Sequence, residues 1–162
     1  MHEEKTNVMR ILDQKKIPYV PHAYPHGEGE AVDGLTVAGL IGKDPSVVFK
    51  TLVTRGASKS YYVFVIPVPA ELDLKKAAKA VGEKSIEMIH VKELTPLTGY
   101  VRGGCSPIGT KKRLKTVLDA TAQGQTTVVV SAGKIGSQVE LAPQALSALV
   151  GASFAALSKD LP

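Results

Sequence analysis

The sequence predicts a mixed α/β (α+β) fold, with a barrel-like β-sheet flanked by several short helices. Segments rich in β-branched and aromatic residues outnumber the segments with helical spacing. These strand-like segments occur both as adjacent pairs and with helical segments between them, so antiparallel and parallel pairings are both expected. The 162 residues fit a single domain, residues 1–162, because the chain shows no internal repeat and no interdomain linker.

The composition is that of an ordinary soluble protein with an aliphatic core. Hydrophobic residues make up 44% of the chain and charged residues 22%, with three Phe and no Trp. One cysteine excludes an internal disulfide, and neither a leader nor an apolar run long enough to span a bilayer is recognised. We therefore expect a cytoplasmic protein without a membrane partner. The formal net charge of +5 favours an anionic partner.

The first third of the chain is expected to hold two helices and an extended arm. Residues 6–16 carry apolar side chains at helical spacing behind a capping residue. Residues 17–24 contain two prolines, which donate no ladder hydrogen bonds, so this segment is at most an edge strand. Residues 36–41 begin with the capping residue Thr36 and end at Gly42, which predicts a short helix.

The remaining elements alternate between strands and helices. Asp73 caps a predicted helix through Ala80, and Gly82 ends it. Residues 91–97 are expected to form a helical turn that Pro96 breaks. Further strands are predicted at 85–90, 114–120, 126–132, 138–142 and 153–158, and a helix at 143–150.

Lys50 is the sharpest single signal for a functional site. It lies in the predicted strand 47–54, which forms a hairpin with the predicted strand 60–67, and apolar residues flank it on both faces. A lysine that faces a core is costly unless it is paired or opens onto a cleft. Lys50 is therefore either a contact for a phosphate, a carboxylate or a leaving oxygen, or an edge-strand lysine that blocks aggregation.

A glycine-rich loop at residues 99–109 is the second signal. Gly103 and Gly104 are able to present backbone N–H groups to a carbonyl, a phosphate or an oxyanion, although a tight turn between strands has the same composition. Cys105 in this loop is a poor candidate nucleophile, because no residue in the sequence stands out as its general base. Ser131, at the end of an apolar run, is by itself more typical of a turn.

A basic cluster follows the loop. Such a cluster either contacts nucleic-acid phosphates or forms a solvated face. Its members are Lys111, Lys112, Arg113 and Lys115. No P-loop, dinucleotide fingerprint, serine elbow or Cys/His metal spacing is present, so we expect neither a metal nor a cofactor.

Three segments resemble the YbaK/EbsC family, the bacterial Cys-tRNA(Pro) deacylases. They are FKTLV around Lys50, the loop TGYVRGGCSPIG continuing into KKR, and VVVSAGKIG followed by VELAP. The resemblance covers nearly the whole chain, in the family's order. Related domains include the editing insertion of bacterial prolyl-tRNA synthetase, which shares the fold and the lysine but clears alanine.

The resemblance implies an aminoacyl-tRNA deacylase that removes cysteine mischarged onto tRNA(Pro) by prolyl-tRNA synthetase. In that family the thiol of the substrate is thought to attack its own ester, so the protein would contribute positioning and electrostatics. The implied partners are the 3′ end of mischarged tRNA(Pro) and the synthetase. Two alternatives stay open: a deacylase for alanine or another small residue, and a non-catalytic module that binds tRNA or a synthetase.

The resemblance also implies roles for individual residues. Lys50 would favour departure of the ribose oxygen, the loop glycines would line the carbonyl site, Ser131 would orient the aminoacyl group, and Tyr24 would wall the pocket. The implied catalytic residues are Lys50, Gly103, Gly104 and Ser131; the substrate-binding residues are Tyr24, Asp33, Thr51, Ser106 and Gly133; the tRNA-binding residues are Lys111, Lys112 and Arg113.

Two positions depart from the family pattern and leave the amino-acid preference open. Asp33 stands where some members carry an aromatic residue, and Gln138 stands where a small polar or acidic residue is usual.

Overall fold

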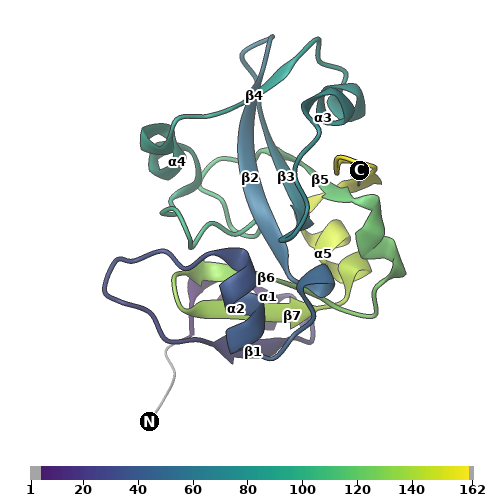
Figure 1. The fold of residues 1–162 in the computed structure, drawn as a ribbon. Coiled ribbons are helices and arrows are strands. Elements are labelled where there is room, and N and C mark those ends of the chain that lie inside the picture. Colours follow the sequence, from purple (N-terminus) through teal and green to yellow (C-terminus); the bar gives the residue numbers. More distant parts are fainter. Residues whose placement is uncertain (1–4, 161–162) are drawn as a thin grey trace.

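The computed structural model describes residues 5–160 and contains two open β-sheets with helices packed around them (Figure 1). The smaller sheet has the order β1-β7-β6 and is antiparallel throughout. Its strands are β1 (Val20–Ala23), β7 (Ser137–Leu141) and β6 (Val128–Lys134). Among the described residues β1 pairs with β7 alone and forms the edge, which confirms the edge strand expected from its prolines.

The larger sheet has the order β4-β2-β3-β5-β8. β2 pairs antiparallel with β3 and β4, while β3, β5 and β8 run parallel. Its strands are β2 (Phe49–Gly56), β3 (Tyr61–Pro67), β4 (Ile86–Met88), β5 (Lys115–Asp119) and β8 (Ser153–Ala155). The predicted hairpin and the mixed pairing are confirmed. The barrel-like closure is not confirmed, because the strands of residues 5–160 form two open sheets.

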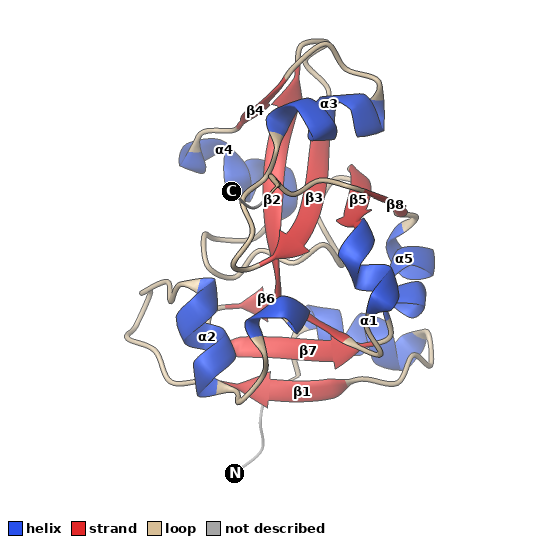
Figure 2. Cartoon of the chain, turned by 45° about the vertical axis from the view of Figure 1, so that its right-hand side comes forward, coloured by secondary structure: helices blue, strands red, loops and turns tan. Residues whose placement is uncertain are grey.

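Within residues 5–160, five α-helices and two short 3-10 helices cover these sheets. Figure 2 shows α2 beside the three-stranded sheet and α3 against the upper end of the β2–β3 hairpin. No helix in the described range is long and apolar enough to cross a bilayer. The α-helices are α1 (Asn7–Gln14), α2 (Gly34–Leu40), α3 (Leu74–Val81), α4 (Val91–Thr98) and α5 (Pro143–Val150); the 3-10 helices are η1 (Pro45–Val47) and η2 (Ala120–Gly124).

Two of the predicted helices need correction. α2 begins at Gly34 and its N-cap is Asp33, whose carboxylate accepts from the Thr36 backbone N–H at 3.0 Å. Thr36 therefore lies inside the helix, because the aspartate three residues earlier takes the capping position. α4 continues through Pro96 to Thr98, since the proline is exposed and the buried Leu97 and Thr98 hold the last turn against the protein.

β3 separates two parts of the hydrophobic core. Val63 and Val65 point into a cluster that includes side chains of α1, α5 and the smaller sheet. Phe64 and Ile66 point into a second cluster, with Leu72 and residues of α3. Because both faces of β3 are covered, its sequence reads as a continuous apolar run instead of an alternation.

The two sheets meet where β2 begins. Val48 forms a parallel bridge with Val129 of β6, and its carbonyl accepts from the Val68 N–H at 2.8 Å. These three valines and Ala38 of α2 form a small buried cluster. The start of β2 is thereby fixed beside the start of β6.

An ion network centred on Glu140 ties the smaller sheet to the segment after α2. The Glu140 carboxylate, whose side chain is only 11% exposed, contacts His22 of β1 at 2.8 Å and Lys43 at 3.0 Å. It also accepts from the Thr127 hydroxyl at 2.5 Å. Burial raises the pKa of Glu140, but the hydrogen bonds from Thr127, His22 and Lys43 outweigh it and hold this pKa at about 2.

We predict that Glu140→Gln lowers the free energy of unfolding at pH 7 by about 3 kcal/mol, as the pKa shift from 4.5 to about 2 implies. Because the folded pKa lies below the unfolded one, this stabilisation is present above about pH 4.5 and is lost as the pH falls to about 2. Urea unfolding at several pH values measures both the loss of unfolding free energy at pH 7 and its dependence on pH. Glu87→Gln, at an exposed carboxylate paired with Arg55, is the control and should cost less than about 1 kcal/mol.

Candidate active site

A cavity of about 170 Å³ lies at the junction of the two sheets. Its apolar wall comes from α2 and the residues just before it, from the start of β2 and from the segment after β3. Its polar wall comes from five separate parts of the chain. The polar side chains are Tyr24, Lys50, Thr51, Cys105, Ser131 and Gln138; the apolar side chains are Val32, Val37, Val48, Phe49 and Val68; Gly34 and Gly103 complete the lining.

Lys50 lies at the edge of this cavity. Its side chain is half-buried, and its Nζ donates a hydrogen bond to the Val68 carbonyl at 3.2 Å. Burial lowers the pKa of Lys50, although the charge of nearby Glu71 acts in the opposite direction. A partly desolvated ammonium with one backbone partner keeps donor capacity for an oxygen of a ligand.

Three buried polar atoms in the cavity have no hydrogen-bond partner within the described part of the chain: Tyr24 Oη, Thr51 Oγ1 and Gln138 Oε1. The side chains of Tyr24 and Gln138 are buried, with exposed fractions of 5% and 6% for the two residues. Leaving such atoms unpaired costs free energy, and native proteins satisfy almost all of them. Their gathering in one cavity indicates a site for a polar ligand.

The glycine loop contributes shape more than free donors. Gly103 lines the cavity with a φ of +87°, and a Cβ there would lie 2.7 Å from the Ala31 Cβ. The Gly104 N–H donates to the Val101 carbonyl at 2.9 Å and so closes a turn. Gly104 also packs against the backbone of Lys134 and Ile135. This N–H is engaged within the loop, and the role of Gly104 as a donor to the substrate carbonyl stays a prediction.

Ser131 lies in the cavity, while two of the other expected residues have structural roles beside it. The Ser131 Oγ accepts from the Gly133 N–H at 3.1 Å, and Gly133 itself does not line the cavity. Ser106 is fully buried, and its Oγ accepts from the Ile108 N–H at 3.2 Å. Ser106 therefore shapes the loop, and the free hydroxyl proton of Ser131 is available to the cavity.

Asp33 and the basic cluster also lie outside the cavity lining. Asp33 is exposed and caps α2, whose next residue, Gly34, does line it. Lys111, Lys112 and Arg113 are exposed on the segment that follows the loop. In residues 5–160, no group of three or more His, Cys, Asp or Glu is arranged to hold a metal ion.

Sequence reasoning did not assign Gln138 or Cys105 to the site. The alternation of polar and apolar residues in β7 places Gln138 and Glu140 on one face, and this pattern was the available signal. Cys105 lies in the wall of the cavity, and burial raises the pKa of its thiol to about 11. Its thiol is therefore protonated at neutral pH, as expected for a packing residue.

Comparison with known proteins identifies the family. A model of the family described as the aminoacyl-tRNA editing domain matches residues 31–149. The chain belongs to this family. It is also 46% identical over 156 residues to a protein of Enterococcus faecalis (strain ATCC 700802 / V583) named as a proposed Cys-tRNA(Pro)/Cys-tRNA(Cys) deacylase, EbsC, covering 96% of this chain and 94% of that one. The resemblance inferred from the sequence motifs is thereby confirmed.

Solved structures agree with this family assignment. A proposed trans-editing enzyme for prolyl-tRNA synthetase superposes with a TM-score of 0.81 at 26% identity, covering 94% of this chain and 95% of that one. A hypothetical protein, APE2540, superposes with a TM-score of 0.84 at 22% identity, covering 96% and 100%. The second comparison shows the fold alone.

We predict that Cys105 reacts slowly with iodoacetamide at pH 7.5 and that the rate rises steeply only as the pH approaches about 11, because the thiolate is the reactive form. Mass spectrometry of the native protein measures the rate. The unfolded protein is the control, and the alkylation rate of its cysteine should depend on pH as that of an ordinary thiol does. Fast alkylation of the native protein at neutral pH would contradict the assignment of Cys105 as a protonated wall residue.

Proposed function

We propose that this protein is an aminoacyl-tRNA deacylase that removes cysteine mischarged onto tRNA(Pro). One observation carries the proposal: a small cavity opens beside Lys50 in a chain of the aminoacyl-tRNA editing family, and three of its buried polar atoms have no partner in residues 5–160. The 46% identity to the Enterococcus protein EbsC supports cysteine as the amino acid that is removed.

The cavity suits the aminoacyl end of such a substrate. A volume of about 170 Å³ is below the range of roughly 300–1,000 Å³ typical of whole-ligand pockets, so it selects a small group. We assign the unpaired oxygens of Tyr24, Thr51 and Gln138 to the polar groups of the aminoacyl moiety. Ser131 donates its hydroxyl proton in the same cavity, and Lys50 faces the ribose oxygen of the ester.

The chemistry then uses the substrate as its own nucleophile. The cysteine sulfur of the substrate attacks the ester carbonyl, a carbon–sulfur bond forms, and the carbon–oxygen bond to the ribose breaks. The thiol proton ends on the departing ribose oxygen, and the cyclic thiolactone hydrolyses to cysteine. The Lys50 ammonium stabilises the negative charge that develops on the leaving oxygen, and the cavity holds the substrate thiol close to the ester carbonyl.

A deacylase for alanine is the second candidate, because a cavity of this volume also accepts a methyl side chain. The two candidate functions differ in the source of the nucleophile. Alanine carries none, so its removal requires an activated water, whereas cysteine removal does not.

The deciding experiment is deacylation of tRNA(Pro) charged separately with cysteine, serine and alanine. Cysteine should be cleared far faster than serine, because the thiol is the nucleophile of the proposed mechanism. Exchange of sulfur for oxygen changes binding by only about 1 to 3 kcal/mol, so a larger difference in rate cannot come from binding alone. Mass spectrometry at early times should show the thiolactone before free cysteine. Equal rates for cysteine and serine would reject the mechanism, and alanine as the best substrate would favour the second candidate.

We predict that Lys50→Met lowers kcat for Cys-tRNA(Pro) by about 100-fold or more, the scale of losing one electrostatic contact to the transition state. The melting temperature should stay the same or rise, because removal of a partly desolvated charge relieves an unfavourable burial. Single-turnover deacylation and calorimetry measure the two effects. Lys79→Met, at an exposed lysine of α3, is the control for lost charge. Full activity of Lys50→Met would remove Lys50 from the site.

We further propose that the basic cluster contacts the acceptor stem and that prolyl-tRNA synthetase supplies tRNA identity, with the reaction in the cytoplasm, where tRNA is charged. The exposed positions of Lys111, Lys112 and Arg113, outside the cavity, suit contacts with backbone phosphates. These contacts position the RNA without reading its sequence.

The corresponding prediction concerns salt. Replacing Lys111, Lys112 and Arg113 by Gln should reduce the slope of log K against log salt for tRNA binding by about 2 to 3, because three phosphate contacts are lost. Fluorescence anisotropy over a range of KCl concentrations measures the slope. A triple variant at the exposed residues Lys79, Lys84 and Lys92 carries the same charge change elsewhere and is the control. Equal slopes for the cluster variant and the wild type would place the docking face elsewhere.

A further inference from the structure

A second, larger cavity of about 610 Å³ adjoins Lys50 on the outer face of β2. It is bounded by β2, by the segment that leads into α3, by β4 and by the end of the chain near Lys159. Its lining residues are Lys50, Leu52, Glu71, Leu72, Asp73, Leu74, Lys75, Met88 and Lys159. Lys50 is common to this cavity and to the smaller one, so the two are neighbours across a single side chain.

The apolar part of this cavity includes two large side chains that are left exposed. Leu74 is 42% exposed and Met88 is 47% exposed, although both belong to helix or strand elements that bury other apolar residues. Leu52 and Leu72 form the deeper part of the wall. Exposed apolar surface inside a concave site is typical of a surface that a flat or apolar ligand group covers.

The charged part of the cavity has a surplus of cations. Glu71 is paired with Lys159 at 3.2 Å. The Asp73 carboxylate accepts from the backbone N–H groups of Lys75 and Lys76 at the start of α3. Lys50 and Lys75 form no ion pair within residues 5–160. The cavity therefore favours a ligand that carries negative charge next to an apolar group.

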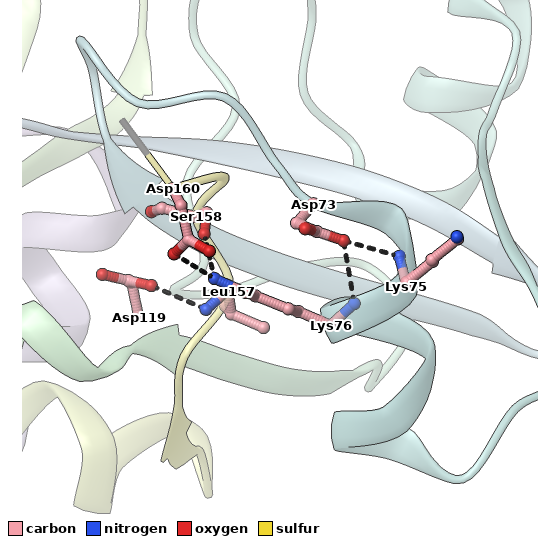
Figure 3. A network of polar contacts seen from close by, with 7 residues as sticks. All are labelled: Asp73, Lys75, Lys76, Asp119, Leu157, Ser158 and Asp160. Carbon is pink, nitrogen blue, oxygen red and sulfur yellow. Dashed lines mark hydrogen bonds and ion pairs between the residues drawn. The ribbon is translucent and has the colours of Figure 1, made fainter. Parts of the chain in front are cut away.

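The two lysines at the start of α3 have different tasks. Lys76 reaches the C-terminal segment, where its Nζ donates to the Ser158 carbonyl at 2.8 Å and contacts Asp160 at 2.9 Å. Figure 3 shows the Lys75 side chain pointing away from this network. Lys76 thus fastens the wall of the cavity, and Lys75 is left for a partner outside the network.

The link between the cavities is the Lys50 side chain. Its Nζ donates to the carbonyl of Val68, a residue that lines the smaller cavity, so the ammonium lies where the two cavities meet. An ester whose acyl end occupies the smaller cavity has its alcohol end at this ammonium. A volume of about 170 Å³ does not accommodate a nucleoside as well, whereas a volume of about 610 Å³ lies within the range of nucleotide-sized pockets.

We propose that the larger cavity binds the 3′-terminal adenosine nucleotide of the aminoacylated RNA, with the base against Leu74 and Met88 and the phosphate at Lys75. This inference rests on the proposed function, because it is the alcohol half of the same ester that enters the second cavity. Lys50 then contacts the ribose between the two halves. The nucleotide part supplies binding energy that holds the ester at the smaller cavity.

Binding of adenosine 5′-monophosphate, followed by methyl NMR, tests the proposal without any deacylation. The chain contains three methionines, of which Met88 lines the cavity and Met9, a residue of α1, is buried in the core, so Met9 is an internal control. Ring currents of a bound base should shift the Met88 methyl resonance in protein labelled at the methionine methyl groups and leave that of Met9 unchanged. The Met88→Leu variant assigns the resonance.

Each outcome decides the proposal. A saturable shift at Met88 that is larger for the nucleotide than for ribose 5-phosphate or inorganic phosphate, and weaker in Lys75→Gln than in Lys79→Gln, supports it. No shift with millimolar nucleotide, an equal shift at Met9, or an equal effect of inorganic phosphate would overturn it. A Met88 shift that only the synthetase produces would assign the cavity to a protein partner and overturn the nucleotide assignment.

A kinetic arm separates this inference from the proposed function. Lys75→Gln should raise KM for Cys-tRNA(Pro) roughly fivefold with kcat unchanged, the scale of one partly solvated ionic contact. Lys79→Gln, on the same helix but outside the cavity, should leave both constants unchanged. An unchanged KM in Lys75→Gln would contradict the phosphate contact while the deacylase activity stands. Nucleotide binding at Met88 without deacylation of any charged tRNA would instead reject the proposed function.

Discussion

The parallel bridge between Val48 and Val129 is the contact on which the candidate site depends. Parallel strands run in the same direction, so residues two positions beyond the bridge lie on the same side of both strands. Those residues are Lys50 and Ser131, and both line the cavity. The bridge is buried in a small cluster with Val68 and Ala38, so the free energy of apolar burial fixes the position of the polar groups.

The two polar networks around this junction are organised in opposite ways. The Glu140 carboxylate has three protein partners, His22, Lys43 and Thr127, and it secures the smaller sheet to the segment behind α2. The cavity beside it keeps buried oxygens without a partner among residues 5–160, at a cost in stability. A fully paired network holds the wall in place, and a partly unpaired one is left for the substrate. Buried polar atoms without a hydrogen-bond partner break a general rule of protein stability, and such exceptions are expected at functional sites.

Much of the fold was predictable because its determinants are local. The helix starts at Thr6 and Asp73, the helix end at Gly82 and the β2–β3 hairpin follow from side chains that satisfy backbone groups within a few residues, and all are present. The helix start at Asp33 was missed because Asp33 and Thr36 are both good capping residues, and tertiary placement of α2 decides between them. The sequence likewise does not reveal that the Val101 carbonyl accepts the Gly104 N–H.

The sequence by itself determined the mixed fold class with most of its strands and helices, the motifs that resemble the editing family, and the single lysine in an apolar strand. Periodicity, capping and composition act over a few neighbouring residues, so they can be recognised in the sequence alone. Only the tertiary structure decided that the strands form two open sheets, that Tyr24, Thr51 and Gln138 leave unpaired oxygens in one cavity, and that Lys50 borders a second one. These features arise from contacts between segments distant along the chain, and no local pattern specifies how such segments pack.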